Sequence, residues 1–327
     1  KRELILGLDV GSVSINLVLL DEKYHVLEKL YLRTQGKPIA VLSEGLEMIS
    51  QSMPPGSTIA GVGATGSGRE LAGAMVDADV VKNEITSHAV AALMYVPDVR
   101  TVIEIGGQDS KIIILRDNIV VDFAMNTVCA AGTGSFLDRQ AERLGISIED
   151  FGKLALKSSN PVRIAGRCAV FAESDMIHKQ QLGHNQEDIV KGLCDALVRN
   201  YLNNVGKGKN IESPVVFQGG VAANEGIKQS FEETLNTSVY VPEYFDVMGA
   251  VGAGILAKEE MRKKKSTNFR GFGISEMEYH VKGIDCLGCS NACEVVEIKE
   301  NDVVIARYGD RCGKWTNSLN NRESKFA

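Results

Sequence analysis

Two cysteines in the middle of the sequence occupy turns that suit a metal or redox centre. Cys129 is followed by a Gly/Ala-rich turn, Ala130–Gly134, and then by a predicted helix. Cys168 also precedes a predicted helix, at about 173–182. A helix N-terminus stabilises a thiolate, and thiolates bind iron–sulfur clusters. Either cysteine alone is equally compatible with an inert buried thiol, but two in matching settings favour a cluster. Because a cubane needs four ligands, a two-fold dimer is the simplest way to complete it.

Four further cysteines are concentrated near the C-terminus. They are Cys286, Cys289, Cys293 and Cys312, in the pattern C-x2-C-x3-C-x18-C. A predicted hairpin, 295–299 and 303–308, separates the last two. So short a segment has too little apolar surface for a core of its own, which predicts a metal module. Zinc ribbons usually have two C-x2-C knuckles, so the x3 spacing slightly favours a [4Fe–4S] cluster over Zn²⁺.

Two strand–turn–strand segments have the residue types that bind nucleotide phosphates and Mg²⁺. The predicted strand 3–10 contains Asp9 and the strand 101–105 contains Glu104, and a Gly-containing turn follows each. Turn amides bind phosphates, and the carboxylate holds Mg²⁺ through water. An ordinary hairpin is the alternative for either copy alone, but the repeat makes chance less plausible for both. The candidate phosphate-binding residues are Gly11, Ser12, Val13, Gly106 and Gly107.

Other polar and Gly-rich positions complete the candidate nucleotide site. Gln108 and Asp109 follow the second turn and are candidates for orienting the attacking water. Gly219 and Gly220 end the predicted strand 214–219 and open into a helix, so with Asn224 they are candidates for the adenosine site. A pair on a predicted helix, Glu84 and His88, suits metal binding, but hydrogen-bonded structure is the favoured interpretation.

Composition bounds the class of protein. The chain has 327 residues, enough for two domains with room for a small third, and its 33 Gly suit an α/β fold with many tight strand–helix turns. The net charge is −6 without a basic stripe, which argues against a nucleic-acid partner. No apolar run is long enough to cross a membrane. Seven cysteines without a secretory signal indicate thiols and metal ligands in a reducing cytoplasm.

The expected domain organisation follows from shifts in composition. We expect a first ATPase lobe at 1–95 and a second lobe with the cluster-binding helices at 96–262. A charge run, Glu259–Lys265, then leads into a linker at 263–275. The metal module would occupy 276–315, followed by a polar tail at 316–327.

Several motifs together resemble one protein family over about residues 3–260. The chain resembles the ATP-dependent activators, or reductase components, of 2-hydroxyacyl-CoA dehydratases and benzoyl-CoA reductases. It is also similar to the reductases of double-cubane cluster proteins. The nucleotide turns belong to the wider actin/hexokinase/heat-shock chaperone superfamily, whereas the two cysteine segments are specific to this family. The motifs are Asp9–Ser12, Ala64–Gly66, Ile105–Asp109, Asn126–Gly134, Cys168–Ser174 and Gly219–Ala222.

The resemblance implies a structure, a reaction and partners. It implies a two-lobed, actin-like ATPase fold of duplicated ribonuclease H-like domains, with ATP/ADP and Mg²⁺ in the cleft. It implies a homodimer whose Cys129 and Cys168 hold one shared [4Fe–4S] cluster. Single low-potential electrons would pass from a ferredoxin or flavodoxin to a partner iron–sulfur enzyme. Two positions differ from the family, which often has Lys at Asn16 and Asp at Glu104.

Two other functions compete with this reading. A small-molecule or acyl kinase of the same superfold explains the nucleotide turns but gives no role to the two central cysteines. A metal-sensing, ATP-binding regulator would use the C-terminal module as its sensor. That regulator requires a nucleic-acid or protein surface that the sequence does not show.

Overall fold

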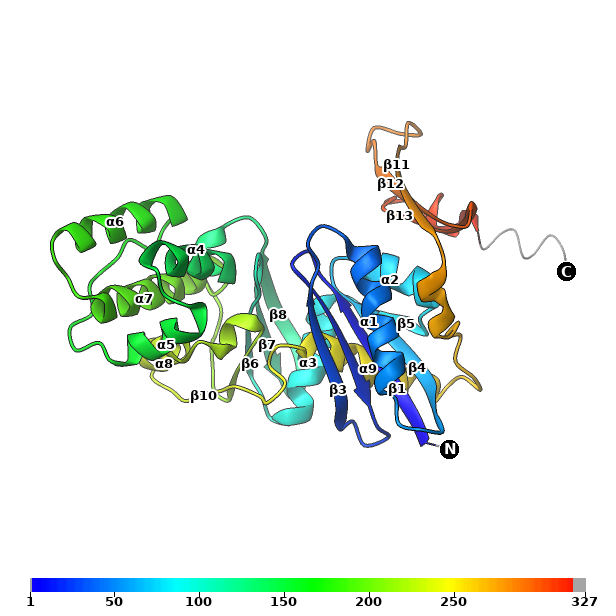
Figure 1. Ribbon diagram of the computed structural model, residues 1–327, viewed down its shortest axis with the longest axis horizontal. Helices are drawn as coiled ribbons and strands as arrows, with labels where there is room; N and C mark the ends of the chain where they lie inside the picture. Colours follow the sequence, from blue (N-terminus) through cyan, green and yellow to red (C-terminus); the bar gives the residue numbers. More distant parts are fainter. Residues whose placement is uncertain (1, 320–327) are drawn as a thin grey trace, which may run out of the picture. The chain divides into compact units, whose positions relative to one another are not determined.

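Each of two structural units is built on a five-stranded mixed sheet (Figure 1). The computed structural model describes residues 2–319. The first unit comprises Lys1–Glu84 with Gly249–Ala327, and the second comprises Ile85–Met248. The helix that ends the expected second lobe is therefore grouped mainly with the first unit. Of the predicted tail, 316–327, residues 320–327 lie outside the described part of the chain.

The sheet of the first unit has the order β3-β2-β1-β4-β5. Its central strand pairs antiparallel with β2 and parallel with β4. The helix α9 packs directly on this sheet, because a Cβ on Gly7 or Gly63 would lie 2.0 Å from a carbonyl oxygen of α9. The elements are β1 (Arg2–Val10), β2 (Ser14–Leu20), β3 (Val26–Arg33), α1 (Pro38–Ser52), β4 (Ser57–Thr65), α2 (Arg69–Val76), β5 (Val80–Val81) and α9 (Met248–Met261).

The second unit repeats this design. Its sheet order, β10-β9-β6-β7-β8, is that of the first unit read from the other edge, with the same two antiparallel and two parallel pairings. This repetition fits the expected duplication. The strands are β6 (Thr101–Ile105), β7 (Ser110–Arg116), β8 (Ile119–Asn126), β9 (Val215–Gln218) and β10 (Val239–Tyr240). The helices are α3 (Glu84–Tyr95), α4 (Gly134–Leu144), α5 (Ile148–Leu156), α6 (Ala169–Gln181), α7 (Gln186–Asn204) and α8 (Glu225–Leu235).

The C-terminal segment forms a three-stranded antiparallel sheet, β11-β12-β13. The predicted hairpin is present as β12 (Glu294–Glu300) and β13 (Val303–Tyr308), and β11 (Tyr279–Asp285) adds a strand that the sequence pattern did not indicate. Ile274, Tyr279 and Ile298 are buried in the apolar core of the first unit. The segment thus shares an existing core, which removes the argument that it needs a metal to fold.

The expected linker, 263–275, is bonded to the first unit. The hydroxyl of Thr267 and the backbone N–H of Asn268 donate to the Asp79 carboxylate at 2.5 and 2.8 Å. The same carboxylate accepts the backbone N–H of Val62 at 2.9 Å. Asp79 therefore joins this connection to the strand β4.

Among the residues from 2 to 319, no helix combines the length and apolar character needed to cross a membrane.

Candidate functional site

Asp9 is the second-to-last residue of β1. It pairs with Asn16 of β2 and with Thr65 of β4. Gly66 follows with φ +99°, and a Cβ there would lie 2.6 Å from Oδ1 of Asp9 and 2.3 Å from the carbonyl oxygen of Val10. Only glycine fits this position, so the backbone of Gly66 lies close to the Asp9 carboxylate. The buried Thr65 hydroxyl has no hydrogen-bond partner among the described residues. A polar ligand at Asp9 would satisfy it.

The turn between β1 and β2 is fixed by bonds to its own backbone. The N–H of Gly11 donates to the Ser14 carbonyl at 2.9 Å, so this predicted phosphate-binding amide is engaged within the turn. Thr34 donates its hydroxyl to the Gly11 carbonyl at 3.1 Å and its N–H to the Val13 carbonyl at 2.9 Å. These bonds hold the turn in one shape next to Ser12.

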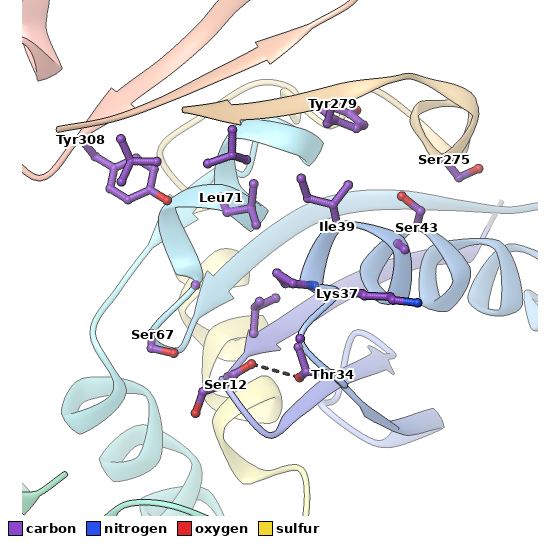
Figure 2. A pocket seen from close by; sticks show the side chains of 18 of the residues that line it. Ser12, Thr34, Lys37, Ile39, Ser43, Ser67, Leu71, Ser275, Tyr279 and Tyr308 are labelled. Carbon is purple, nitrogen blue, oxygen red and sulfur yellow. Dashed lines mark hydrogen bonds between the residues drawn. The ribbon is translucent and has the colours of Figure 1, made fainter. Parts of the chain in front are cut away.

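A cavity of about 930 Å³ begins at this turn (Figure 2). Ser12, Thr34 and Lys37 line one side of it, and Tyr279 and Tyr308 of the C-terminal sheet line the opposite side. The C-terminal sheet is therefore a neighbour of the candidate phosphate turn within the first unit.

A buried lysine in β7 follows the matching turn of the second unit. Nζ of Lys111 lies 3.1 Å from Oε2 of Glu104 and 2.8 Å from Oδ2 of Asp109. The side chains of Lys111 and Glu104 are 3% and 7% exposed. One buried cation thus balances two of the predicted site carboxylates. Sequence reasoning missed this role, although a lysine that begins an otherwise apolar strand, KIIILR, signals a buried partner.

The Gly219 turn closes over Glu104. Gly219 has φ +92°, and a Cβ there would lie 2.9 Å from Oε1 of Glu104. Oδ1 of Asn224 accepts the N–H of Ile227 at 3.0 Å, so this predicted adenosine ligand caps α8. Its buried Nδ2 has no partner among residues 2–319. The cap accounts for the oxygen of this asparagine, and the adenosine contact stays a prediction.

His88 is a structural residue of the second unit. Its Nδ1 lies 2.8 Å from Nε2 of Gln218, the last residue of β9. Burial, with a smaller effect of the Lys111 charge, lowers the pKa of His88 to about 3. The imidazole is therefore neutral at physiological pH, and the contact of its Nδ1 with Gln218 fits the interpretation of hydrogen-bonded structure.

The second-unit turn is bonded to the helix that follows Cys129. The N–H of Gly134 donates to the Gly106 carbonyl at 2.9 Å, and the N–H of Ser135 donates to the Gly107 carbonyl at 2.8 Å. A Cβ on Gly134 would lie 3.2 Å from the same Gly106 oxygen, so glycine permits this close approach. A displacement of the turn would therefore be transmitted to the first residues of α4.

Cys129 and Cys168 both stand at N-terminal caps. Cys129 precedes the 3-10 helix η1 (Ala130–Gly132), and Cys168 directly precedes α6, which begins earlier than the predicted start at 173. Both thiols are partly exposed. Apolar side chains beside them face solvent, with Val128 93% and Phe171 66% exposed. Two accessible thiols within exposed apolar surface suit a centre that a second chain covers.

The four C-terminal cysteines lie on and beyond the β11–β12 connection. The N–H of Cys286 donates to the Cys293 carbonyl at 2.8 Å. The nearby Trp315 side chain and the Gly288 amide lower the pKa of the Cys286 thiol. In the described part of the chain, no three His, Cys, Asp or Glu side chains are grouped closely enough to hold a metal ion. Metal binding by Cys286, Cys289, Cys293 and Cys312 stays a prediction.

Comparisons with known proteins agree on one family. The family model of the BadF/BadG/BcrA/BcrD ATPase family matches residues 6–257. The (R)-2-hydroxyglutaryl-CoA dehydratase activating ATPase of Acidaminococcus fermentans is 34% identical over 79% of this chain and 98% of its own length. The activator of lactoyl-CoA dehydratase of Anaerotignum propionicum is 34% identical over 79% and 99%. Both alignments leave about a fifth of this chain unmatched.

Solved structures give the same result. The activator of the 2-hydroxyisocaproyl-CoA dehydratase from Clostridium difficile, with bound ADPNP, superimposes with a TM-score of 0.71 at 31% identity. That match covers 80% of this chain and 97% of the activator. The expected actin-like α/β ATPase architecture is therefore confirmed.

Proposed function

Because the chain belongs to the BadF/BadG/BcrA/BcrD ATPase family, we propose that it is an ATP-hydrolysing iron–sulfur reductase. It passes single low-potential electrons to a partner metalloenzyme. The acceptor is a 2-hydroxyacyl-CoA dehydratase, a benzoyl-CoA reductase or a double-cubane cluster protein. Relatives whose names record dehydratase activation support this assignment.

The observation that carries the proposal is the pair of bonds from Gly134 and Ser135 to the Gly106–Gly107 turn. A kinase has no need to connect its phosphate turn to a cysteine-bearing loop. An ATPase that drives electron transfer needs such a connection, since the nucleotide state must change the surroundings of the redox centre.

The nucleotide assignments follow the acidic strand and the glycine turn of each unit. Asp9 and Glu104 would hold Mg²⁺ through water, and Gln108 and Asp109 would orient the attacking water. Within the first unit, the unsatisfied hydroxyl of Thr65, the strand partner of Asp9, supports a polar ligand there. When bound, Mg²⁺–ATP supplies the free energy of hydrolysis. The phosphate-turn and adenosine assignments are Gly11, Ser12, Val13, Gly106, Gly107, Gly219, Gly220 and Asn224.

Cys129 and Cys168 are assigned to the redox centre. Their thiols, two from each chain of a homodimer, match the four-thiolate ligand set of a [4Fe–4S] cluster. When bound, the cluster supplies the one-electron carrier. Cys168 stands at the N-terminal cap of α6, where the helix dipole favours a thiolate, and Cys129 stands at the cap of the short η1.

The remaining assignments complete the proposed pathway. The four C-terminal cysteines would hold a second metal, with a [4Fe–4S] cluster slightly favoured over Zn²⁺. The pKa of Cys286, lowered by Trp315 and Gly288, supports a thiolate ligand there. A ferredoxin or flavodoxin in the cytoplasm is the proposed electron donor.

Anaerobic purification of the full chain tests the proposal. We expect iron and sulfide in the protein, together with ATP hydrolysis that falls by orders of magnitude in Asp9→Asn. Asp21→Asn, at a carboxylate on the β2–β3 turn, is the matched control and should retain wild-type turnover. Hydrolysis without iron would favour the kinase alternative, and ATP binding without turnover would favour the regulator.

A further inference from the structure

Asn200 of α7 lies where the two cysteine segments come together. It is 3% exposed. Its Nδ2 lies 3.8 Å from Sγ of Cys129. The same Nδ2 donates to the carbonyl oxygens of Gly166 at 2.8 Å and Arg167 at 3.3 Å, the two residues before Cys168. One buried amide therefore contacts the thiol of one cysteine and the backbone that leads into the other.

The orientation of this amide is fixed by its neighbours. Asn204, one turn later on α7, donates its Nδ2 to Oδ1 of Asn200 at 3.0 Å. With Oδ1 engaged as an acceptor, the two N–H groups of Nδ2 are directed toward the two carbonyls and the sulfur, so at least two of these three acceptors share one N–H. Oδ1 also lies 3.9 Å from Sγ of Cys129. A deprotonated sulfur only accepts, however, so the N–H contact is the favourable one for a metal-bound thiolate.

The cysteine loop reaches Asn200 because it has a glycine at the contact. A Cβ on residue 132 would lie 2.9 Å from Oδ1 of Asn200, and Gly132 avoids this collision. The next residue of α7, Tyr201, donates its hydroxyl to the Lys111 carbonyl at 2.5 Å. The helix α7 is thus bonded both to the cysteine loops and to the strand β7 that follows the Gly106–Gly107 turn.

We propose that Asn200 is a positioning residue that joins both cysteine loops and sets the reduction potential of the redox centre through an N–H···S hydrogen bond. This inference rests on the proposed function, since it takes Cys129 as a cluster ligand. Hydrogen bonds to ligand sulfur are stronger in the reduced, more negative state, so they raise the potential. In the proposed dimer, each chain contributes one such bond.

The test is a redox titration of the full chain after anaerobic cluster reconstitution. Asn200→Leu keeps a similar side-chain size but removes the donor. We expect unchanged iron content and a more negative midpoint potential. At a fixed potential, the ratio of reduced to oxidised cluster should fall about nine- to a hundredfold, since the shared cluster loses two modest hydrogen bonds, each worth about three- to tenfold. That corresponds to about 56–118 mV for one electron.

Asn203→Leu is the matched control, because Asn203 is an exposed asparagine on the same helix. Its potential should equal that of the wild type. A wild-type potential in Asn200→Leu at full iron content would overturn the inference while leaving the proposed function intact. A wild-type protein that binds no iron would instead contradict the proposed function.

If the Asn200→Leu protein does not assemble a cluster, a second measurement still tests the inference. Amide hydrogen exchange of the folded, cluster-free chain reports directly on the two loops. Exchange across 127–133 and 165–169 should accelerate in Asn200→Leu and in Asn200→Asp, which has nearly the same shape but no amide donor. Asn203→Leu should match the wild type. Equal exchange in all four proteins would show that Asn200 does not join the loops.

Discussion

At the scale of single residues, Lys111 neutralises two carboxylates of the candidate nucleotide site. It is buried between Glu104 and Asp109, and both carboxylates are assigned to the nucleotide site. Asp109 is a third exposed, so solvent screens that contact, whereas Glu104 is buried. The Glu104–Lys111 pair therefore determines whether a carboxylate remains charged inside the second unit.

We predict that Lys111→Met destabilises the second unit by about 3–5 kcal/mol, because it leaves the buried Glu104 carboxylate without its cation. Denaturant unfolding measures this loss. Lys111→Met/Glu104→Gln should recover much of it by removing the unpaired charge. Lys209→Met breaks an ion pair with the exposed Asp122 and should change stability little. A loss in Lys111→Met no larger than that in Lys209→Met would show that the buried pair contributes little.

His88 gives the second unit a specific pH dependence. Its pKa is about 3 in the folded chain and about 6.5 when exposed, so the unfolded state takes up the proton first. The contribution to stability is complete above about pH 6.5 and is lost as the pH falls toward 3. Each unit of pH within that window costs about 1.4 kcal/mol.

The variant His88→Gln should therefore lose less stability than the wild type between pH 6.5 and 4.5, by on the order of 2–3 kcal/mol. Unfolding at several pH values measures the slope, which is independent of any constant effect of the substitution. His184→Gln alters an exposed histidine and should keep the wild-type slope. Identical slopes in all three proteins would mean that His88 takes up its proton without unfolding.

The residue-scale chemistry was only partly predictable from sequence. Asp9, Glu104 and the two central cysteines stand next to glycine turns, and local spacing reveals such positions. Asn200 is 71 residues from Cys129 in sequence, and nothing near it marks the contact. The helix-cap role of the Asn224 oxygen was not predicted from sequence, because the Gly-rich turn before it indicated only a ligand contact, which stays a prediction.

At the scale of elements, buried strands were easier to predict than exposed ones. β6 coincides with its predicted range because all five of its residues are buried and apolar runs stand out. In β8 the apolar side chains of Ile119, Val121 and Phe123 are exposed. The positions of its apolar residues therefore do not mark a buried face of the strand. β11 is mostly polar and exposed, and only its pairing with β12 reveals it.

The C-terminal sheet is an element whose removal gives a clear prediction. Ile274, Tyr279 and Ile298 are buried in the first-unit core, where η3 (Phe272–Glu276) contacts α1 and β13 contacts α2. Truncation after Lys265 should lower the stability of the first unit by several kcal/mol, at about 1.5–3 kcal/mol per buried large apolar side chain. Thermal unfolding of the truncated and full chains measures the loss.

The same truncation separates the two proposed metal sites. Cys129 and Cys168 belong to the second unit, so the central cluster and the dimer should survive. Metal per dimer should fall by two module equivalents. Thr267→Val, which removes one bond to Asp79 but keeps the sheet, is the control and should retain all the metal. Loss of the central cluster on truncation would place the C-terminal sheet within the proposed redox core.

At the scale of the whole molecule, the two duplicated sheets contain the residues on which the proposed coupling depends. Each unit presents an acidic strand and a glycine turn, and the second unit adds the cysteine helices behind its turn. The alternating strands and helices made this two-lobed class predictable. The grouping of α9 with the first unit was not, because packing of Gly7 and Gly63 against that helix connects positions about 190–240 residues apart.

The number of thiol ligands leads to the prediction that tests the whole assembly. The second unit offers two partly exposed cysteines at helix N-termini, while its third cysteine, Cys194, is buried and has a raised thiol pKa. A four-ligand cluster at this site therefore requires two chains.

Cys129→Ser in the chain truncated after Lys265 should lose all its iron rather than half, because both chains of the dimer lose a ligand together. The dimer of this variant should also dissociate at a higher protein concentration than that of the truncated parent, because it has lost the shared cluster that cross-links the two chains. Iron analysis and analytical ultracentrifugation measure the two effects, and Cys194→Ala should leave both the iron and the dimer as in the truncated parent. One intact cluster per chain in the Cys129→Ser protein would exclude a shared centre and return the kinase alternative to first place.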